Sequence, residues 1–154
     1  MALDAKIIID GKNGKKTIPI NNFFIGYRKT KLKQGDFIYS VKIPILKYNI
    51  FKAYKISKRF DDDISSVCGS FNLEINKNHI KRAKIAFGGM SEVPKRAIKT
   101  EKILINSEFS EKIFDKATKN LEKDFSPIDD MRASKKSVSY THLRAHETDA
   151  YLVC

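Results

Sequence analysis

Short apolar segments separated by turn residues fill the first part of the chain. Residues 7–9 and 17–20 are largely apolar, and the Asp-Gly and Asn-Gly pairs within 10–14 supply the positive φ that tight hairpin turns need. Residues 37–43 then alternate as a strand, which Pro44 ends because proline cannot donate to a ladder. The pattern therefore predicts a short β-hairpin followed by a third strand.

The longest alternating stretch lies in the middle of the chain. Residues 51–57 alternate, and apolar or small residues then recur at every second position over 67–75. A period of two is typical of a strand with one buried face. A polar turn at 76–79 leads into a returning strand that reaches Phe87, so the sequence predicts an antiparallel meander of about three long strands.

Helical spacing replaces the alternation after residue 90. Pro94 suits the first turn of a helix over 95–104, and Ser110 with Glu111 begins a second helix. Its apolar residues recur at intervals of three and four, at Phe114, Ala117, Leu121 and Phe125. A last helix is expected from 129, where acids suit the positive end of the helix dipole. Strands followed by segregated helices predict an α+β fold, with an antiparallel three- to four-stranded sheet and helices packed on one face.

The strand pattern changes to the helical pattern at residues 85–90, whose sequence is IAFGGM. The strand stops at Gly88 and Gly89, which remove side-chain bulk where the backbone must bend or where a ligand comes close. A plain bend is the simpler interpretation, because isolated glycines usually mark turns. The local pattern leaves both interpretations open.

The charge of the chain raises the question of a nucleic-acid partner. The chain has 154 residues, a formal net charge of +12 and a pI near 9.7, and lysines gain affinity for phosphates through counterion release. The lysines are spread over every segment, which favours a solvated surface and no nucleic-acid partner. A small basic α+β RNA-binding module is kept as the alternative function, with stacking candidates at Phe23, Phe24, Tyr27 and Arg28.

The two cysteines indicate the compartment. Cys68 and Cys154 form no spacing typical of a metal site or a disulfide framework, which favours a reducing compartment. Cys68 lies in an apolar segment and is expected to be buried as a small hydrophobic residue. The first six residues include an acid and no long apolar region, so a cytoplasmic protein with no membrane partner is predicted.

The histidines give no catalytic or metal-binding set. His79 lies in a polar turn and is expected to be exposed. His142 and His146 are four residues apart, as on one face of a zinc-binding helix, but a third ligand is missing. Both lie in residues 137–154, which lack the lysine and isoleucine bias of the preceding chain and are interpreted as a non-native, adapter-derived tail. We therefore predict no catalytic residue and no metal ligand.

Four short motifs follow one another along the chain. They are FFIGYRKT at 23–30, KRFDDDIS at 58–65, AFGGM at 86–90 and DDMRAS at 129–134. Together they resemble successive signatures of the FAD-binding subunit or domain of bacterial xanthine dehydrogenase, and four motifs in order are more specific than any one of them. The resemblance covers about residues 3–136 and includes a similarity to the C-terminal domain of carbon monoxide dehydrogenase flavoproteins.

The resemblance implies a division of the chain. Residues 1–45, with the hairpin, would be the end of an FAD-binding domain, 46–136 a truncated carbon monoxide dehydrogenase flavoprotein C-terminal-like domain, and 137–154 the tail. The family's glycine-rich loops for the FAD pyrophosphate would precede Met1, so a fragment truncated at both ends is expected. Such a fragment would not be active alone.

The resemblance also implies cofactors and partners. The intact protein would be the flavoprotein component of a molybdenum-containing xanthine dehydrogenase, in which FAD receives electrons from iron–sulfur clusters and passes them to NAD. The molybdopterin and the iron–sulfur clusters would lie on partner domains or subunits of the same enzyme.

Two cofactor contacts follow from the resemblance. Ile85 corresponds to the residue that the family places against the flavin, with its backbone near the ring edge, and Gly88 and Gly89 would hold that geometry. Lys102 is the nearest candidate for a cation that contacts FAD, although strict alignment places Ile103 there. The resemblance implies no acid or base, because in flavin hydride transfer the cofactor does the chemistry.

The charged block at residues 58–63 has two interpretations. It could face the cofactor or the electron acceptor, or it could be a self-neutralising turn. Exposed ion pairs contribute only about 0 to 1 kcal/mol each. The structural interpretation is preferred.

Overall fold

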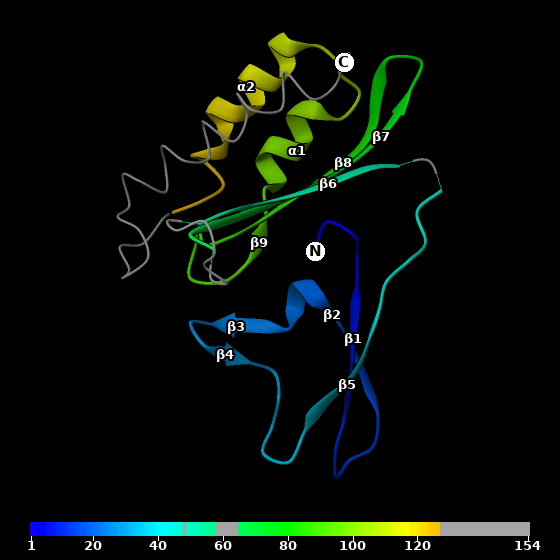
Figure 1. The fold of residues 1–154 in the computed structure, drawn as a ribbon, viewed down its shortest axis with the longest axis vertical. Helices are drawn as coiled ribbons and strands as arrows, with labels where there is room; N and C mark the ends of the chain where they lie inside the picture. Colours follow the sequence, from blue (N-terminus) through cyan, green and yellow to red (C-terminus); the bar gives the residue numbers. More distant parts are fainter. Residues whose placement is uncertain (48, 58–64, 127–154) are drawn as a thin grey trace.

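The computed structural model describes residues 1–47, 49–57 and 65–126 (Figure 1). They form a three-stranded and a four-stranded sheet, called the first and the second sheet, together with a small two-stranded sheet and a layer of helices. The charged block at 58–63, the helix expected from 129 and the tail at 137–154 with its two histidines lie outside the described residues. Two of the four motifs, at 23–30 and 86–90, are described in full.

The predicted hairpin and third strand form the first sheet. Its strands have the order β2-β1-β5 and are antiparallel, with β1 in the centre. Ile7 and Ile9 of β1 form a small core with Phe23. The elements of this part are β1 (Lys6–Asp10), β2 (Lys16–Pro19), the short helix η1 (Ile20–Asn22), β3 (Phe24–Gly26), β4 (Lys29–Thr30) and β5 (Phe37–Lys42).

The predicted meander forms the second sheet, whose antiparallel strands have the order β6-β7-β8-β9. The pairing of β7 with β8 shifts between Glu74 and Ile75. This β-bulge explains why Ile80 and Ala83, three residues apart, are both buried. The strands are β6 (Asn49–Ile56), β7 (Val67–Asn76), β8 (His79–Gly88) and β9 (Lys95–Arg96).

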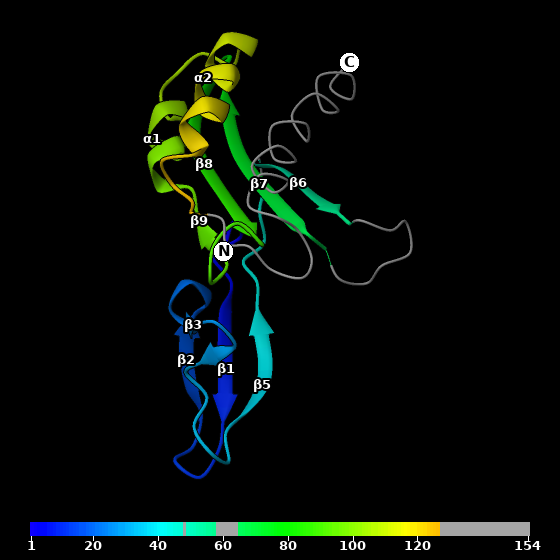
Figure 2. The ribbon, with the colours of Figure 1, turned by 90° about the vertical axis from the view of Figure 1, so that its left-hand side faces the viewer.

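Two helices, α1 (Ile98–Leu104) and α2 (Glu111–Leu121), cover one face of the second sheet (Figure 2). Apolar residues of β8 and both helices share one buried cluster with Phe125, and the rings of Phe87 and Phe125 pack edge to face with centroids 5.3 Å apart. The predicted α+β fold, with helices on one face of an antiparallel sheet, is confirmed.

The prediction of a helix over 95–104 is wrong at its start. Lys95 and Arg96 pair with Phe87 and Ala86 of β8 as a fourth strand, and the Ala97 amide donates to the Ile85 carbonyl at 2.8 Å. The helix therefore begins only at Ile98. The hydrogen bonds available at the edge of β8 outweigh the helix-favouring Pro94.

The prediction that Cys68 is buried is also wrong. Cys68 is exposed, whereas its neighbours Val67 and Gly69 are buried. Successive residues of a strand point to opposite faces, so the period of two that buries Val67 turns Cys68 outward. His79 is exposed, as predicted.

Candidate functional site

The turn at Gly88 and Gly89 is fixed by a close approach of two backbones. Gly89 has φ +85°, and a Cβ there would lie 2.1 Å from the carbonyl oxygen of Ser66. Only glycine fits this position without displacing the segment before β7. At Gly88 a Cβ would meet no described atom within 4 Å, so contacts among described residues do not require glycine there.

Ile85 lies in β8 on the face covered by the helices. It is only 4% exposed and belongs to the main apolar cluster. Its amide donates to Glu101 Oε1 at 2.8 Å, and its carbonyl accepts from the Ala97 amide. Both backbone polar groups of Ile85 are therefore already engaged within the chain.

The carboxylate of Glu101 is the group that fixes Ile85, and the sequence analysis did not identify it. Glu101 in α1 is 3% exposed and accepts two hydrogen bonds from Arg96 of β9, from Nε at 2.9 Å and from Nη2 at 2.5 Å. The hydrogen bond to Glu101 raises the pKa of Arg96 above its ordinary value. One carboxylate thus joins β8, β9 and α1. If one helix covered residues 95–104, Arg96 and Glu101 would point to different sides of it. The predicted helix therefore gave no reason to expect this ion pair.

Lys102 lies in the last turn of α1 and is exposed. Ile85 lies between the sheet and α1, so it belongs to the interior of the unit while Lys102 belongs to its surface. The structure does not bring these two residues together into one pocket among the described residues.

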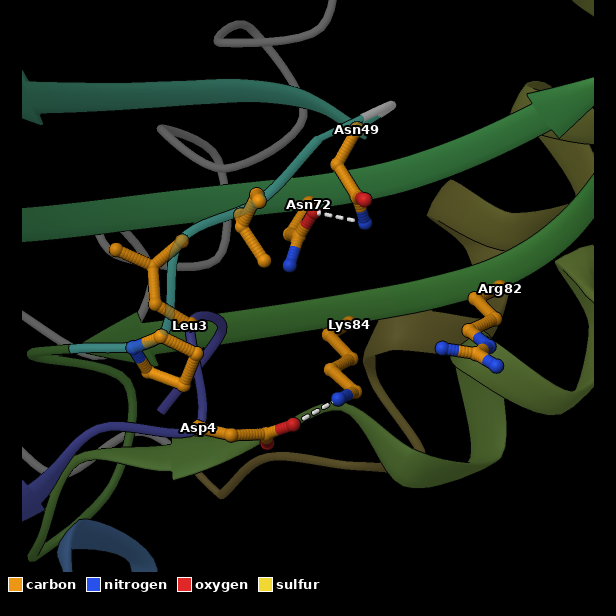
Figure 3. A pocket seen from close by; sticks show the side chains of 8 residues that line it. Leu3, Asp4, Asn49, Asn72, Arg82 and Lys84 are labelled. Carbon is orange, nitrogen blue, oxygen red and sulfur yellow. Dashed lines mark hydrogen bonds and ion pairs between the residues drawn. The ribbon is translucent and has the colours of Figure 1, made fainter.

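The opposite face of the second sheet meets the start of the chain. Asn72 of β7 is 3% exposed, donates to the Ala2 carbonyl at 2.8 Å and accepts from Asn49 Nδ2 at 2.8 Å. Lys84 of β8 forms an ion pair with Asp4 (Figure 3). These contacts attach the first residues of the chain to the sheet.

A pocket of about 210 Å³ lies at this junction, lined by Leu3, Asp4, Pro44, Leu46, Asn49, Asn72, Arg82 and Lys84. Pockets for cofactors and drug-sized ligands usually hold about 300–1,000 Å³. The junction pocket is therefore too small to enclose FAD.

The first motif reaches the loop that follows the glycine turn. The Tyr27 amide donates to Glu92 Oε1 at 2.9 Å, and Arg28 has φ +55° at the tip of the β3–β4 hairpin. Phe23, by contrast, is buried in the core of the first sheet. The motif at 23–30 thus combines a core residue with a contact to Glu92, in the loop that follows the motif at 86–90.

Two family models match successive parts of the chain. Residues 52–136 match the family model described as the CO dehydrogenase flavoprotein C-terminal domain. The chain belongs to this family. Residues 1–46 match a second model, the FAD binding domain in molybdopterin dehydrogenase, so the predicted resemblance is confirmed.

Several of the relatives are xanthine dehydrogenases by name. The chain is 35% identical over 133 residues to xanthine dehydrogenase/oxidase of Gallus gallus, which covers 82% of this chain and 10% of the relative. It is 34% identical over 122 residues to xanthine dehydrogenase of Oryza sativa subsp. japonica, which covers 76% of this chain and 9% of the relative. The chain thus spans about a tenth of these curated relatives.

Solved structures share the fold. Carbon monoxide dehydrogenase from Hydrogenophaga pseudoflava, in a form that lacks the Mo-pyranopterin moiety, superposes with a TM-score of 0.85 at 18% identity. The match covers 93% of this chain and 50% of that chain. Quinoline 2-oxidoreductase from Pseudomonas putida 86 gives a TM-score of 0.76 at 21% identity, over 96% of this chain and 54% of that chain.

Two absences can be stated for the described residues, 1–47, 49–57 and 65–126. No helix in this part of the chain is long and apolar enough to cross a membrane. No group of three or more His, Cys, Asp or Glu side chains is placed to hold a metal ion within the same part.

Proposed function

We propose that the chain forms one wall of the FAD pocket in the flavoprotein component of a molybdenum-containing xanthine dehydrogenase. The observation that carries this proposal is the succession of two family matches along one chain, the FAD-binding domain at 1–46 and the flavoprotein C-terminal domain at 52–136. The proposal keeps the division at 1–45 and 46–136, with a non-native tail at 137–154.

The geometry limits which groups of this wall can contact FAD. The Ile85 amide already donates to Glu101 and the Ile85 carbonyl accepts from the Ala97 amide, so only the second lone pair of this carbonyl is left for the expected hydrogen bond to the flavin edge. The Ile85 side chain is buried in the main apolar cluster, so in this proposal Ile85 serves by positioning β8. The exposed ammonium of Lys102 is available to a phosphate or to the flavin.

The junction pocket is too small to enclose FAD, and the proposal gives this chain a part of the site only. FAD, when bound, would carry electrons from iron–sulfur clusters to NAD, after a molybdopterin centre oxidises a purine. The partners would be the molybdopterin-binding and iron–sulfur domains or subunits of the same enzyme, in the cytoplasm. The chain alone would not be catalytic.

A chimeric enzyme tests this proposal. The matched region of the chicken xanthine dehydrogenase/oxidase is replaced by residues 1–136 of this chain, and the FAD content and the reduction of NAD by xanthine are measured. We expect FAD to be retained and Lys102→Gln to lower its affinity, whereas Lys119→Gln, an exposed lysine of α2, should leave it unchanged. A folded chimera that holds no FAD would contradict the proposal.

The RNA-binding alternative receives no support from the relatives and structures named above, which are dehydrogenases and an oxidoreductase by name. A gel shift in increasing salt separates the two functions. Submicromolar binding that weakens steeply with salt would favour the RNA-binding module. We expect no such binding.

A further inference from the structure

The junction pocket has two cations and a buried amide on one face of the second sheet. Arg82 and Lys84 lie two positions apart in β8 and alternate with the buried Ala83 and Ile85, so the period of two turns both cations away from the helices. The pairing of β7 with β8 places Asn72 directly opposite Lys84, on the same face. Figure 3 shows these three side chains around the pocket.

Asn72 gives the pocket a fixed polar group. It is 3% exposed, donates one hydrogen bond to the Ala2 carbonyl and accepts one from Asn49 Nδ2. A side-chain amide has two N–H donors and two acceptor lone pairs. The contacts with other described residues use one of each, so a polar ligand in the pocket can use the others.

The two cations have more donors than their ion pairs use. Lys84 pairs with Asp4, and an ammonium group has three N–H donors. Arg82 is paired through Nε, which lies 3.4 Å from Glu74 Oε2, and 73% of its side-chain surface is exposed. Such an exposed pair is weak, so the guanidinium can turn its Nη groups toward the pocket. The polar part of the pocket therefore offers more donors than acceptors.

The rest of the lining is apolar and consists of Leu3, Pro44 and Leu46. The volume of about 210 Å³ equals that of roughly seven molecules of liquid water, since each takes about 30 Å³. A ligand of similar size is a small organic molecule. The combination of donors and apolar side chains favours a ligand with an acceptor group at one end and an apolar body at the other.

We propose that the junction pocket binds a small monocarboxylate, whose carboxylate accepts hydrogen bonds from Arg82 and Lys84 and whose body packs against the apolar lining. A carboxylate only accepts hydrogen bonds and matches the guanidinium fork with two parallel bonds. The carboxylate of Asp4 lines the same pocket and repels a second negative charge on the ligand. Binding at this pocket does not depend on the proposed role in FAD binding.

Titration of the 154-residue chain with benzoate tests this site, because benzoate joins one carboxylate to a small apolar ring. Amide chemical shifts are followed by NMR at constant ionic strength. We expect saturable shifts at Asn72 and at residues 82–84. Benzamide, which lacks the charge, and acetate, which lacks the ring, should each bind about tenfold more weakly or less tightly still.

Two substitutions in β8 separate recognition of the carboxylate from a general effect of charge. Arg82→Gln should weaken benzoate binding about tenfold, and Arg82→Lys, which keeps the charge but loses the fork, should have a smaller effect. The matched control, Lys81→Gln, removes one charge from the exposed neighbouring residue outside the lining and should leave binding nearly unchanged. Thermal unfolding of each variant checks that it remains folded.

Four outcomes would overturn the proposal: no saturable shift, shifts confined to residues outside the pocket, equal weakening by Arg82→Gln and Lys81→Gln, or benzamide that binds as tightly as benzoate. Equal weakening by the two variants would show a response to overall charge. Inorganic phosphate that binds more tightly than benzoate would assign the pocket to an inorganic anion and would also contradict the monocarboxylate.

Discussion

Replacing Glu101 by alanine should destabilise the chain more than any surface substitution. The change removes the carboxylate that accepts from Arg96 and from the Ile85 amide, in a position that is 3% exposed. Breaking a buried ion pair by removing one partner costs about 3–5 kcal/mol, and an unsatisfied buried amide costs about 1–3 kcal/mol. The two costs overlap because one carboxylate serves both donors.

The Arg96 side chain keeps 21% of its surface in water, so it can be partly rehydrated after the change. We therefore expect a loss near the lower end of the range, about 3 kcal/mol in the free energy of unfolding. Domains of this size are stable by about 5–15 kcal/mol, so the variant should still fold. Urea denaturation followed by circular dichroism measures the change from the midpoint at constant slope.

Three further variants sharpen this measurement. Glu122→Ala makes the same change at an exposed position and should shift stability by no more than about 0.5 kcal/mol. Glu101→Gln keeps an acceptor for the Ile85 amide and should cost less than Glu101→Ala. Arg96→Met combined with Glu101→Leu removes both charges and should recover part of the loss. The reasoning is refuted if Glu101→Ala and Glu122→Ala have equal effects.

Three other perturbations follow from the geometry. Asp124 accepts hydrogen bonds from the Lys99 and Thr100 amides at 2.8 Å and so caps α1. Asp124→Ala should lower the free energy of unfolding by about 0.5–2 kcal/mol, measured by thermal unfolding. Asp115→Ala, at an exposed position, should lower it much less. Gly89→Ala should cost well over 1 kcal/mol, because its Cβ meets the Ser66 carbonyl, whereas Gly14→Ala at φ +73° meets no described atom and should cost about 1 kcal/mol. In a Cys154→Ser background a thiol reagent should modify Cys68 in the folded chain at a rate near that of the unfolded chain; strong protection would show that its face is covered.

Elements whose periodic pattern extends over many residues could be predicted from the sequence. Contacts between elements could not. Nine positions of strict alternation identify β7, and the spacing of Ala117, Leu121 and Phe125 predicts the buried side of α2. β9 has only two residues, too few for any period, so its pairing with β8 had to come from the structure.

In the candidate site, too, the contacts between elements could not be predicted from the sequence. A motif could associate Ile85 with a cofactor, but no local pattern shows that Glu101 and Ala97 occupy its backbone. Burial of Cys68 was expected from the apolar composition of its segment, although the alternation around it already placed it on the opposite face from Val67. The apolar composition of the segment predicts the wrong exposure for Cys68, whereas the alternation of the strand predicts the observed one.

The measurement that tests the central claim most directly is equilibrium dialysis of FAD against three samples: the chain, the preceding segment of the chicken relative, and their mixture. Because the proposal gives this chain only one wall of the FAD pocket, the chain alone should retain none. The mixture should retain about one FAD per complex, with an affinity well above that of either part. Tight binding of FAD by the chain alone, or no retention by a complex that has formed, would contradict the claim that this chain supplies one wall of the pocket.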